Sequence, residues 1–393
     1  EEDEMSDVSI QKSSSGVFGR TSSGLVRTVS TFDTFYYCLN MLNPAIGILA
    51  AAAIVFYPGA SYALSTILTV IGAIFLGITY ALFSAVYPRS GAEYVPLSRV
   101  LHPLIGFVGS FSNAVWQAFY FAVAPSYAAA FAWAPLFTVL GLQFNSEALV
   151  NLGLWFDSPT GWFVVGTLII LGSAVVLYRG AGLFFRVQRY LFSFGMVGFL
   201  VLLLVLALGS AGVFDFHSSF DAYSGSGAFD ALVAGAADEA GNLRPSFSMK
   251  ETMFFMVWPA FALLLAVWST AFSGEIKNVT RGQLIAIPAA QIVGGLVMIG
   301  IGVLSRYSFG QQGLLAFGWA GLANPDLLPV AIYPWVSTLA CIMTGSPIVT
   351  ILILGGILAF FLVNVPAVGL YSTRVILAWG IDGLAPEWLR ISC

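Results

Sequence analysis

The chain has 393 residues, of which 59% are hydrophobic and only 9% are charged, and its formal net charge is -4. Its mean hydropathy is +0.90. Soluble domains carry about a quarter of charged residues, so this composition excludes an enzyme of the aqueous phase and indicates a protein embedded in a lipid bilayer. The small negative charge does not suggest a nucleic-acid partner.

The first thirty residues form a polar segment that is acidic at its start and then rich in Ser and Gly. A segment of this composition cannot bury enough apolar surface to fold by itself. The first apolar run that follows is too long for the core of a cleaved signal peptide. We therefore expect residues 1–30 to be a disordered cytoplasmic tail.

Long apolar runs separated by short polar breaks fill the rest of the chain. A helix needs about 20 apolar residues to cross a bilayer, whereas barrel strands are about ten residues long and alternate in polarity. The sequence therefore predicts an all-α polytopic membrane protein. The expected spans are residues 32–57, 61–87, 104–140, 160–178, 187–210, 251–273, 283–305 and 347–378.

Basic residues indicate the orientation, because cytoplasmic loops retain an excess of Lys and Arg. With the N-terminus inside, 12 of the 15 basic residues fall on the cytoplasmic side. The sequence thus predicts a multi-pass protein of the cell membrane with a cytoplasmic N-terminus. The inner residues are Lys12, Arg20, Arg27, Arg89, Arg99, Arg179, Arg186, Arg189, Lys277, Arg281, Arg374 and Arg390.

Two features that could suggest metal or disulfide chemistry are better explained otherwise. The outer stretch 211–250 carries several acidic residues and His217, but their spacing is irregular, which favours a solvated loop over a metal site. Cys38, Cys341 and Cys393 lie far apart and form neither a disulfide framework nor a ligand pair. We expect no metal and no cofactor.

In the next outer stretch, 311–342, we expect short helices against the outer face.

The first span contains Pro44 and Gly47 near its midpoint. Proline removes a backbone donor and clashes with the preceding turn, so it can break a helix. Broken backbone at membrane depth is tolerated where protein or a cavity satisfies it, although a simple proline kink is the alternative. The sixth span has a second candidate interruption within residues 255–262, which include Trp258 and Pro259. Two interrupted spans in corresponding places indicate an inverted-repeat transporter.

Three segments carry a resemblance to a known family: residues 88–99 followed by Gly106 and Phe107, residues 275–278, and residues 372–389. In this order they resemble the amino acid–polyamine–organocation transporters. The resemblance implies an inverted five-helix-repeat fold with discontinuous helices 1 and 6. Residues 31–210 would form the first repeat with helices 1–5, 211–250 an extracellular loop, and 251–393 a partial second repeat with helices 6–8.

The resemblance also implies a substrate site at the two interruptions, with an amino acid or related amine held mainly by backbone groups. A Gly-aromatic-Glu run expected in helix 6 is absent, since residues 265–268 read Leu-Ala-Val-Trp. Any of the side chains could instead serve packing. The implied substrate-binding residues are Asn43, Pro44, Ala45, Ile46, Gly47, Asn113, Trp116, Gln117, Trp258, Pro259, Ala262, Trp268 and Asn364.

The coupling ion is left open by the sequence. Proton-coupled members of the family resemble one another in a lysine within helix 5, where Gly195 stands here, and sodium-coupled relatives use paired hydroxyls in helix 8, which residues 358–366 lack. Intramembrane ionisable residues usually mark ion pathways, and none is expected deep in a span. Exchange or facilitated uptake therefore fits as well as ion-driven uptake.

The resemblance implies a secondary transporter that binds a small-molecule substrate in the lipid bilayer and works by alternating access. The alternative is a non-transporting sensor or receptor on the same fold. A membrane-embedded enzyme has no deep catalytic grouping to support it, since His102 and His217 both lie in loops. Only about eight of the family's usual twelve helices are present, so we expect the polypeptide to continue beyond Cys393, or another chain to supply the rest.

Overall fold

The computed structural model of the chain describes residues 25, 27–241, 243, 245–329 and 332–386. The predicted tail lies almost wholly outside these residues. Within them, eight helices are long and apolar enough to cross a membrane, which confirms the predicted spans and the all-α polytopic fold. They are Thr31–Phe56, Tyr62–Val86, Pro103–Gln143, Pro159–Tyr178, Ala181–Ser210, Met249–Glu275, Val279–Phe309 and Pro347–Ile381.

Several of these spans are built from more than one helical segment. The first comprises α1 (Thr31–Leu42), α2 (Ala45–Ala53) and a short 3-10 turn, and the third comprises α5 (Pro103–Ala128), a π turn and α6 (Ala134–Gln143). The sixth comprises α12 (Met249–Phe255), α13 (Val257–Leu263) and the 3-10 helix η3 (Leu264–Glu275). The uninterrupted spans are α3 (Tyr62–Val86), α8 (Pro159–Tyr178), α9 (Ala181–Ser210), α14 (Val279–Phe309) and α17 (Pro347–Ile381).

Helix starts follow from local sequence, because a serine side chain can accept a hydrogen bond from a backbone amide that lacks a helical partner. Ser30 precedes α1 and forms a reciprocal capping box with Asp33. Ser61, Ser158 and Ser248 accept amide hydrogen bonds in the same way at the starts of α3, α8 and α12. The capping residues therefore set where these spans begin.

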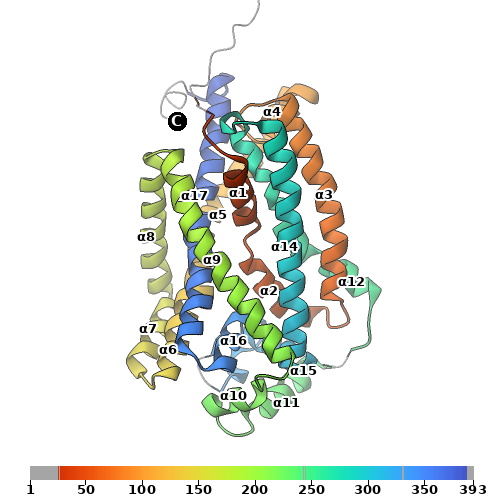
Figure 1. Cartoon of the computed structure of the whole chain (residues 1–393), viewed down its shortest axis with the longest axis vertical. Helices are drawn as coiled ribbons and strands as arrows, with labels where there is room; N and C mark the ends of the chain where they lie inside the picture. Colours follow the sequence, from red (N-terminus) through yellow and green to blue (C-terminus); the bar gives the residue numbers. More distant parts are fainter. Residues whose placement is uncertain (1–24, 26, 242, 244, 330–331, 387–393) are drawn as a thin grey trace, which may run out of the picture.

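The helices run between two ends of an elongated bundle (Figure 1). One end, at the top of Figure 1, holds α4 (Tyr94–Val100), the start of α1 and the end of α17. We call it the basic end, because Arg89, Arg99 and Arg179 belong to it. The opposite end holds α10 (Phe216–Ser224), α11 (Ala228–Ala240), α15 (Gln311–Leu322) and α16 (Val336–Thr344).

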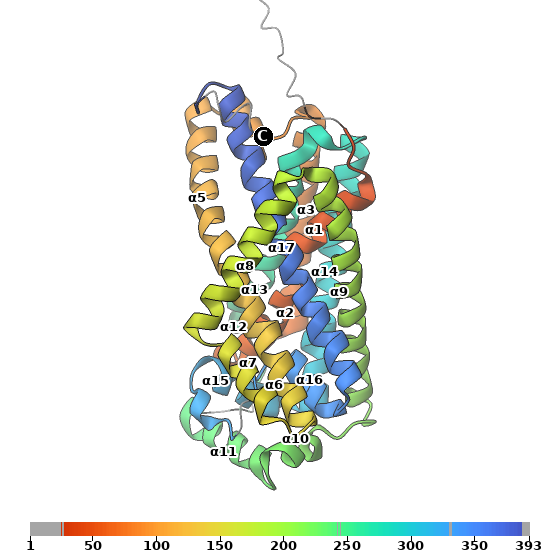
Figure 2. The same cartoon turned by 90° about the vertical axis from the view of Figure 1, so that its left-hand side faces the viewer.

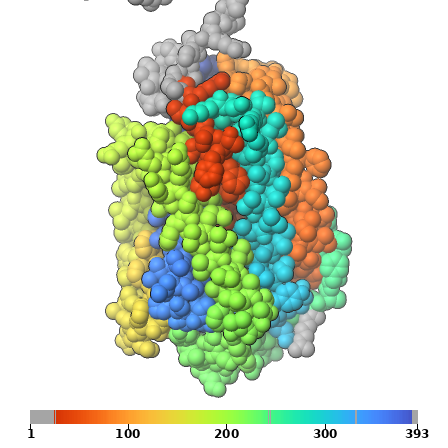
Figure 3. Space-filling view, viewed as in Figure 1, coloured from red at the N-terminus to blue at the C-terminus, as the bar shows by residue number. Residues whose placement is uncertain are grey.

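The first span lies in the centre of the bundle, with α3, α9, α14 and α17 around it (Figure 2). Its most apolar window is 83% buried, whereas the corresponding windows of the second and fourth spans are 28% and 22% buried. The start of α1 still reaches the surface between α9 and α14 (Figure 3), where Phe32 is exposed. A break in the middle of this span is therefore surrounded by protein.

The segments at the opposite end are more ordered than the sequence predicts. Residues 211–250 include the helices α10 and α11, and α7 (Glu147–Phe156) packs on α6 nearby. The predicted short helices of residues 311–342 are present as α15 and α16. However, Leu339, Cys341 and Ile342 are fully buried, so α16 inserts into the bundle instead of lying on its face. Apolar residues in these loops are thus part of the core.

Candidate functional site

The first span is broken at Asn43 and Pro44. α1 ends at Leu42, Asn43 adopts a left-handed conformation with φ 44°, and α2 starts at Ala45. Asparagine tolerates this conformation better than most residues, and its side-chain Oδ1 accepts the Ala45 amide at 3.3 Å. Proline at 44 has no amide to give to the carbonyl of Asn40. The predicted break is therefore present. Helical geometry stops at Leu42 and resumes at Ala45, so the helix is interrupted and not merely bent.

The Asn40 carbonyl, which Pro44 deprives of its α-helical donor, accepts from the Asn43 amide at 3.1 Å and also from a neighbouring helix. Asn364 of α17 donates its Nδ2 to the Asn40 carbonyl at 3.0 Å, and Asn40 donates its own Nδ2 to the Val363 carbonyl at 3.1 Å. Asn40, Asn43 and Asn364 are each 1% exposed. This reciprocal amide pair fixes the break against α17, and it places predicted site residue Asn364 beside it.

The backbone groups at the break are not equivalent. The amides of Ile46 and Gly47 donate to the carbonyls of Asn43 and Pro44 at 2.9 and 3.0 Å, so both are already bonded within the turn. Within the described part of the chain, the carbonyls of Met41 and Leu42 receive no such bond from α2. Free carbonyls attract cations and N–H donors, so the break offers acceptors more readily than donors.

Buried side-chain atoms around the break also lack partners. Asn40 Oδ1, Asn43 Nδ2 and Asn364 Oδ1 are buried without a hydrogen bond to any described residue. Gln117 of α5 is fully buried, and its Oε1 also lacks a hydrogen-bond partner among the described residues. Tyr120, one turn further along α5, faces the Asn43 side chain. Leaving a buried polar atom without a partner costs about 1–3 kcal/mol. These atoms therefore mark a place where a polar ligand or water belongs.

The sixth span is interrupted at two points, and the first of them, Met256, lies within the predicted stretch 255–262. Pro259 lies in the first turn of α13, where a missing amide costs little, so it begins a segment and does not break one. The chain turns at Met256, between α12 and α13, and it changes from α to 3-10 geometry after Leu263. Gln291 of α14 donates its Nε2 to the Leu263 carbonyl at 3.3 Å. The 3-10 segment Leu264–Glu275 is itself kinked at Phe272, where φ is -114° and ψ is 29°, and 3-10 geometry inside a span often marks a functional hinge.

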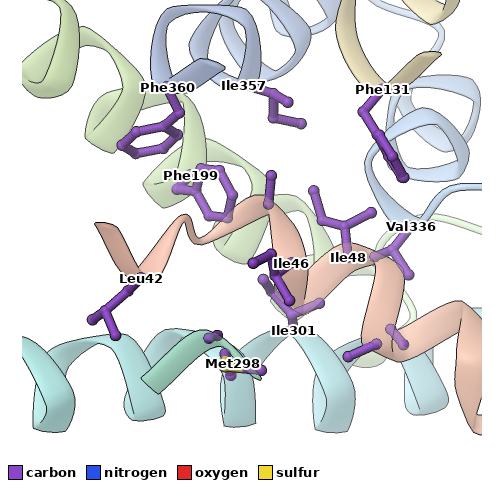
Figure 4. Close-up of a cluster of buried hydrophobic side chains, with 14 of the residues drawn as sticks. Leu42, Ile46, Ile48, Phe131, Phe199, Met298, Ile301, Val336, Ile357 and Phe360 are labelled. Carbon is purple, nitrogen blue, oxygen red and sulfur yellow. The ribbon is translucent and has the colours of Figure 1, made fainter. Parts of the chain in front are cut away.

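Other predicted site residues face away from the break. Gly47 faces α14, where a side chain at this position would contact Ile301 and Met298 at 3.2 and 3.3 Å. Ile46 is packed in an apolar cluster with Ile301 (Figure 4). Trp116 is 55% exposed on α5, so it points out of the bundle. Direct substrate contact by these side chains remains a prediction that this packing does not favour.

The remaining predicted residues lie on the helices that border the interruptions. Ala262 is buried in α13, and the partly buried Trp258 has an indole N–H with no partner among the described residues. Trp268 of η3 packs against Tyr371 of α17 with ring centroids 5.1 Å apart. The side chain of Asn113 donates to the Tyr371 hydroxyl at 2.6 Å.

A polar cluster that the sequence did not predict lies between α5 and α17, towards the basic end. Tyr371 donates its hydroxyl to both carboxylate oxygens of Glu93 at 2.7 Å, and Asn113 donates to Glu93 Oε1 at 2.5 Å. Gln117 reaches Asn113 Oδ1 at 3.4 Å. Hydrogen bonds therefore lead from Glu93 to Gln117, which lies within a turn of Tyr120 beside the break.

Ion pairs fasten both interrupted spans to continuous helices at the basic end. Arg374 of α17 binds Glu275, the last residue of η3, at 2.6 and 3.2 Å, and their side chains are 9% and 5% exposed. Arg189 of α9 binds Asp33 of α1 at 2.6 and 3.1 Å, with the arginine side chain 55% exposed. From the sequence alone, a carboxylate within an apolar span can be recognised as a candidate member of an ion pair. The arginine with which it pairs cannot be predicted in this way.

Two further contacts close the same end. Val29 and Ile276 form an isolated parallel bridge, in which Val29 donates to the Glu275 carbonyl and accepts from the Lys277 amide, both at 3.0 Å. Asp382, after α17, accepts hydrogen bonds from Arg99 and from the Tyr94 hydroxyl, both at 2.8 Å. Burial and this hydrogen bond raise the pKa of Tyr94, so its hydroxyl keeps its proton at neutral pH.

Two interrupted spans that pack together at the centre of an eight-span bundle define a multi-pass membrane transport protein. The chain belongs to the amino acid permease family, which it matches over residues 29–392, and hence to the amino acid–polyamine–organocation superfamily. This membership confirms the resemblance predicted from the sequence. No curated protein matches the chain.

Proposed function

We propose that this permease moves amino acids or related amines across the cell membrane by alternating access, with the substrate bound at the break between α1 and α2. The observation that carries the proposal is the break itself, with unpartnered atoms of Asn40, Asn43 and Asn364 around it in the most buried span. Buried polar groups are normally satisfied, so their common position supports a polar ligand there.

The chemistry of the break suits the two ends of an amino acid differently. The carbonyls of Met41 and Leu42 and the free amide oxygens of Asn40 and Asn364 favour an ammonium group. The unpartnered Asn43 Nδ2 can donate to a carboxylate. Because the backbone amides of α2 are already bonded, we assign the first carboxylate contact to this side chain, assisted by the positive N-terminal end of α2.

Alternating access requires the basic end to open. The ion pairs Glu275–Arg374 and Asp33–Arg189 both join an interrupted span to a continuous helix, so they would separate when the spans move. In the proposed cycle, α1, α3, η3 and α14 rock against a scaffold that includes α5, α8 and α17. The present arrangement is then the state closed at the basic end.

The distribution of basic residues supports a cytoplasmic location for the basic end and the N-terminus. The proposal assigns no coupling ion, because residues 358–366 carry no Ser or Thr pair and Gly195 replaces a lysine. Uptake measured with and without imposed proton or sodium gradients separates exchange and facilitated uptake from ion-driven uptake.

Uptake of labelled amino acids into proteoliposomes tests the proposal, with Asn364→Ala as the diagnostic variant. The change removes the donor to the Asn40 carbonyl, and we expect uptake to fall about tenfold or more, as for loss of about 1.5 kcal/mol or more of binding. Asn151→Ala, an exposed residue of α7, is the control and should transport normally. Binding of amino acids without accumulation or exchange would instead identify a sensor.

A further inference from the structure

A cavity of about 340 Å³ lies at the basic end, apart from the break. Its lining comes from the segment before α1, the end of α3, the loop into α4, the end of η3 and the end of α17. The cavity therefore lies where interrupted and continuous spans meet. Three arginines contribute to its wall: Arg27, Arg89 and Arg99.

The charges in the cavity are unbalanced. Arg99 is neutralised by Asp382, with Nη2 and Oδ2 2.8 Å apart. Arg27 and Arg89 take part in none of the ion pairs found among the described residues. Among the described lining residues, these two guanidinium groups have no carboxylate partner, and a guanidinium has the fork geometry that matches a phosphate or carboxylate group.

A buried hydroxyl in the same wall supports a polar occupant. Ser90 Oγ is buried and makes no hydrogen bond to a described residue. The neighbouring Gly274 packs closely against it, since a Cβ at 274 would come within 3.0 Å of this oxygen. A buried hydroxyl normally has a partner, so an acceptor atom in the cavity would complete it.

Part of the lining is apolar, and it continues onto the outside of the bundle. Val86, Leu377 and Ile381 line the cavity, and Val86 is 68% exposed at the end of α3. Helix ends in a bilayer lie at the level of the lipid headgroups, where anionic lipids attract basic residues. A free anion needs no apolar wall, whereas a phospholipid presents its phosphate and its apolar chains together.

We propose that this cavity binds the phosphate group of an anionic phospholipid, with Arg27 and Arg89 holding the phosphate oxygens and Ser90 donating to one of them. A lipid bound there would bridge the segment before α1 and the end of η3 to α17. It would therefore favour the state closed at the basic end. This consequence for transport rests on the proposed function, whereas the binding itself does not.

The test measures ligand-induced thermal stabilisation of the purified full-length chain in detergent, because a ligand of the native state raises its Tm. The probes are dioctanoyl-phosphatidylglycerol, dioctanoyl-phosphatidylcholine and inorganic phosphate. We expect phosphatidylglycerol to stabilise the protein, and Arg27→Gln with Arg89→Gln to weaken its apparent affinity about tenfold. The control pair, Arg179→Gln with Arg186→Gln, changes two exposed arginines at the same end and should keep the affinity within about twofold.

The other outcomes are also decisive. Ser90→Ala should weaken the affinity by a smaller factor without removing charge. Equal stabilisation by inorganic phosphate, lost in the Arg27 and Arg89 double variant, would keep the phosphate site but assign it to a free anion. Equal stabilisation by phosphatidylcholine, equal loss in both double variants, or no stabilisation by any probe would overturn the proposal. Binding without an effect on uptake would leave the site standing and remove only its role in transport.

Discussion

The two interrupted spans depart from α-helical geometry in different ways. In the first, a single left-handed Asn43 followed by Pro44 breaks the helix, and the Asn43 amide and the Asn364 side chain of α17 both donate to the Asn40 carbonyl. In the sixth, the chain turns at Met256 and then tightens into 3-10 geometry after Leu263. A proline cannot re-form the missing hydrogen bond, whereas a 3-10 helix can relax to an α-helix by changing its bonding partner. The break at Asn43 and Pro44 is therefore a fixed binding element, whereas the 3-10 segment after Leu263 can change its geometry.

The largest expected effect comes from restoring the amide at the first break. Pro44→Ala supplies an N–H that can donate to the Asn40 carbonyl and compete with Asn364, so α1 can continue towards α2. We expect uptake in proteoliposomes to fall below about a tenth of the original rate, with the protein still folded.

Pro259→Ala is the matched control in the sixth span, because Pro259 occupies a first helical turn. It should change stability by no more than about 0.5 kcal/mol and leave uptake nearly unchanged. If the two proline variants lose uptake equally, the distinction between a fixed and an adaptable interruption is wrong.

The second largest effect concerns the ion pairs that hold the two spans at the basic end. Glu275→Gln leaves Arg374 without its buried carboxylate and should destabilise the closed state by about 3–5 kcal/mol. Asp33→Asn should cost only about 1 kcal/mol, because its partner Arg189 is half exposed. The sixth span should therefore be released much more readily than the first.

Alkylation of native cysteines measures this release. Cys38 and Cys341 are both fully buried, Cys38 in α1 and Cys341 in α16 at the opposite end. In a Cys393→Ser background, Glu275→Gln should accelerate maleimide labelling of Cys38 and leave Cys341 slow. Acceleration at both sites would indicate general unfolding and would contradict a local opening.

The smallest effect is expected at the point where the sixth span changes geometry. Gln291→Leu removes the donor to the Leu263 carbonyl, but it also removes the unpartnered Gln291 Oε1, so the two effects partly cancel. We expect a loss of about 1 kcal/mol or less in thermal stability. Asn364→Leu at the first break should reduce uptake far more, and the reverse order would make the sixth span the main binding element.

The eight spans could be predicted from sequence because their length and apolar character are local properties. The break at Pro44 could be predicted for the same reason. The change from α to 3-10 geometry after Leu263 could not be predicted, because it depends on packing and on Gln291, which is 28 positions further along the chain. A single sequence also does not say which face of a helix points inwards, so Trp116 was assigned to the site although it is exposed.

Asn40 and Gln291 were missed as site residues, although each is an amide within a long apolar span. Such residues are expensive in a membrane unless they are satisfied, and this cost is the signal that could have found them. Their partners could not be derived, because Asn40 pairs with a residue 324 positions away. Spacing along one helix carries no information about a contact of that kind.

The bridge between Val29 and Ile276 has a mechanical consequence. Its two backbone hydrogen bonds join the segment before α1 to the end of η3. The basic-end halves of the two interrupted spans are therefore coupled and should move together. A load applied to the polypeptide ahead of Val29, by a bound protein or a fused tag, is passed directly to η3. The segment that precedes Val29 is thus mechanically coupled to the end of the sixth span.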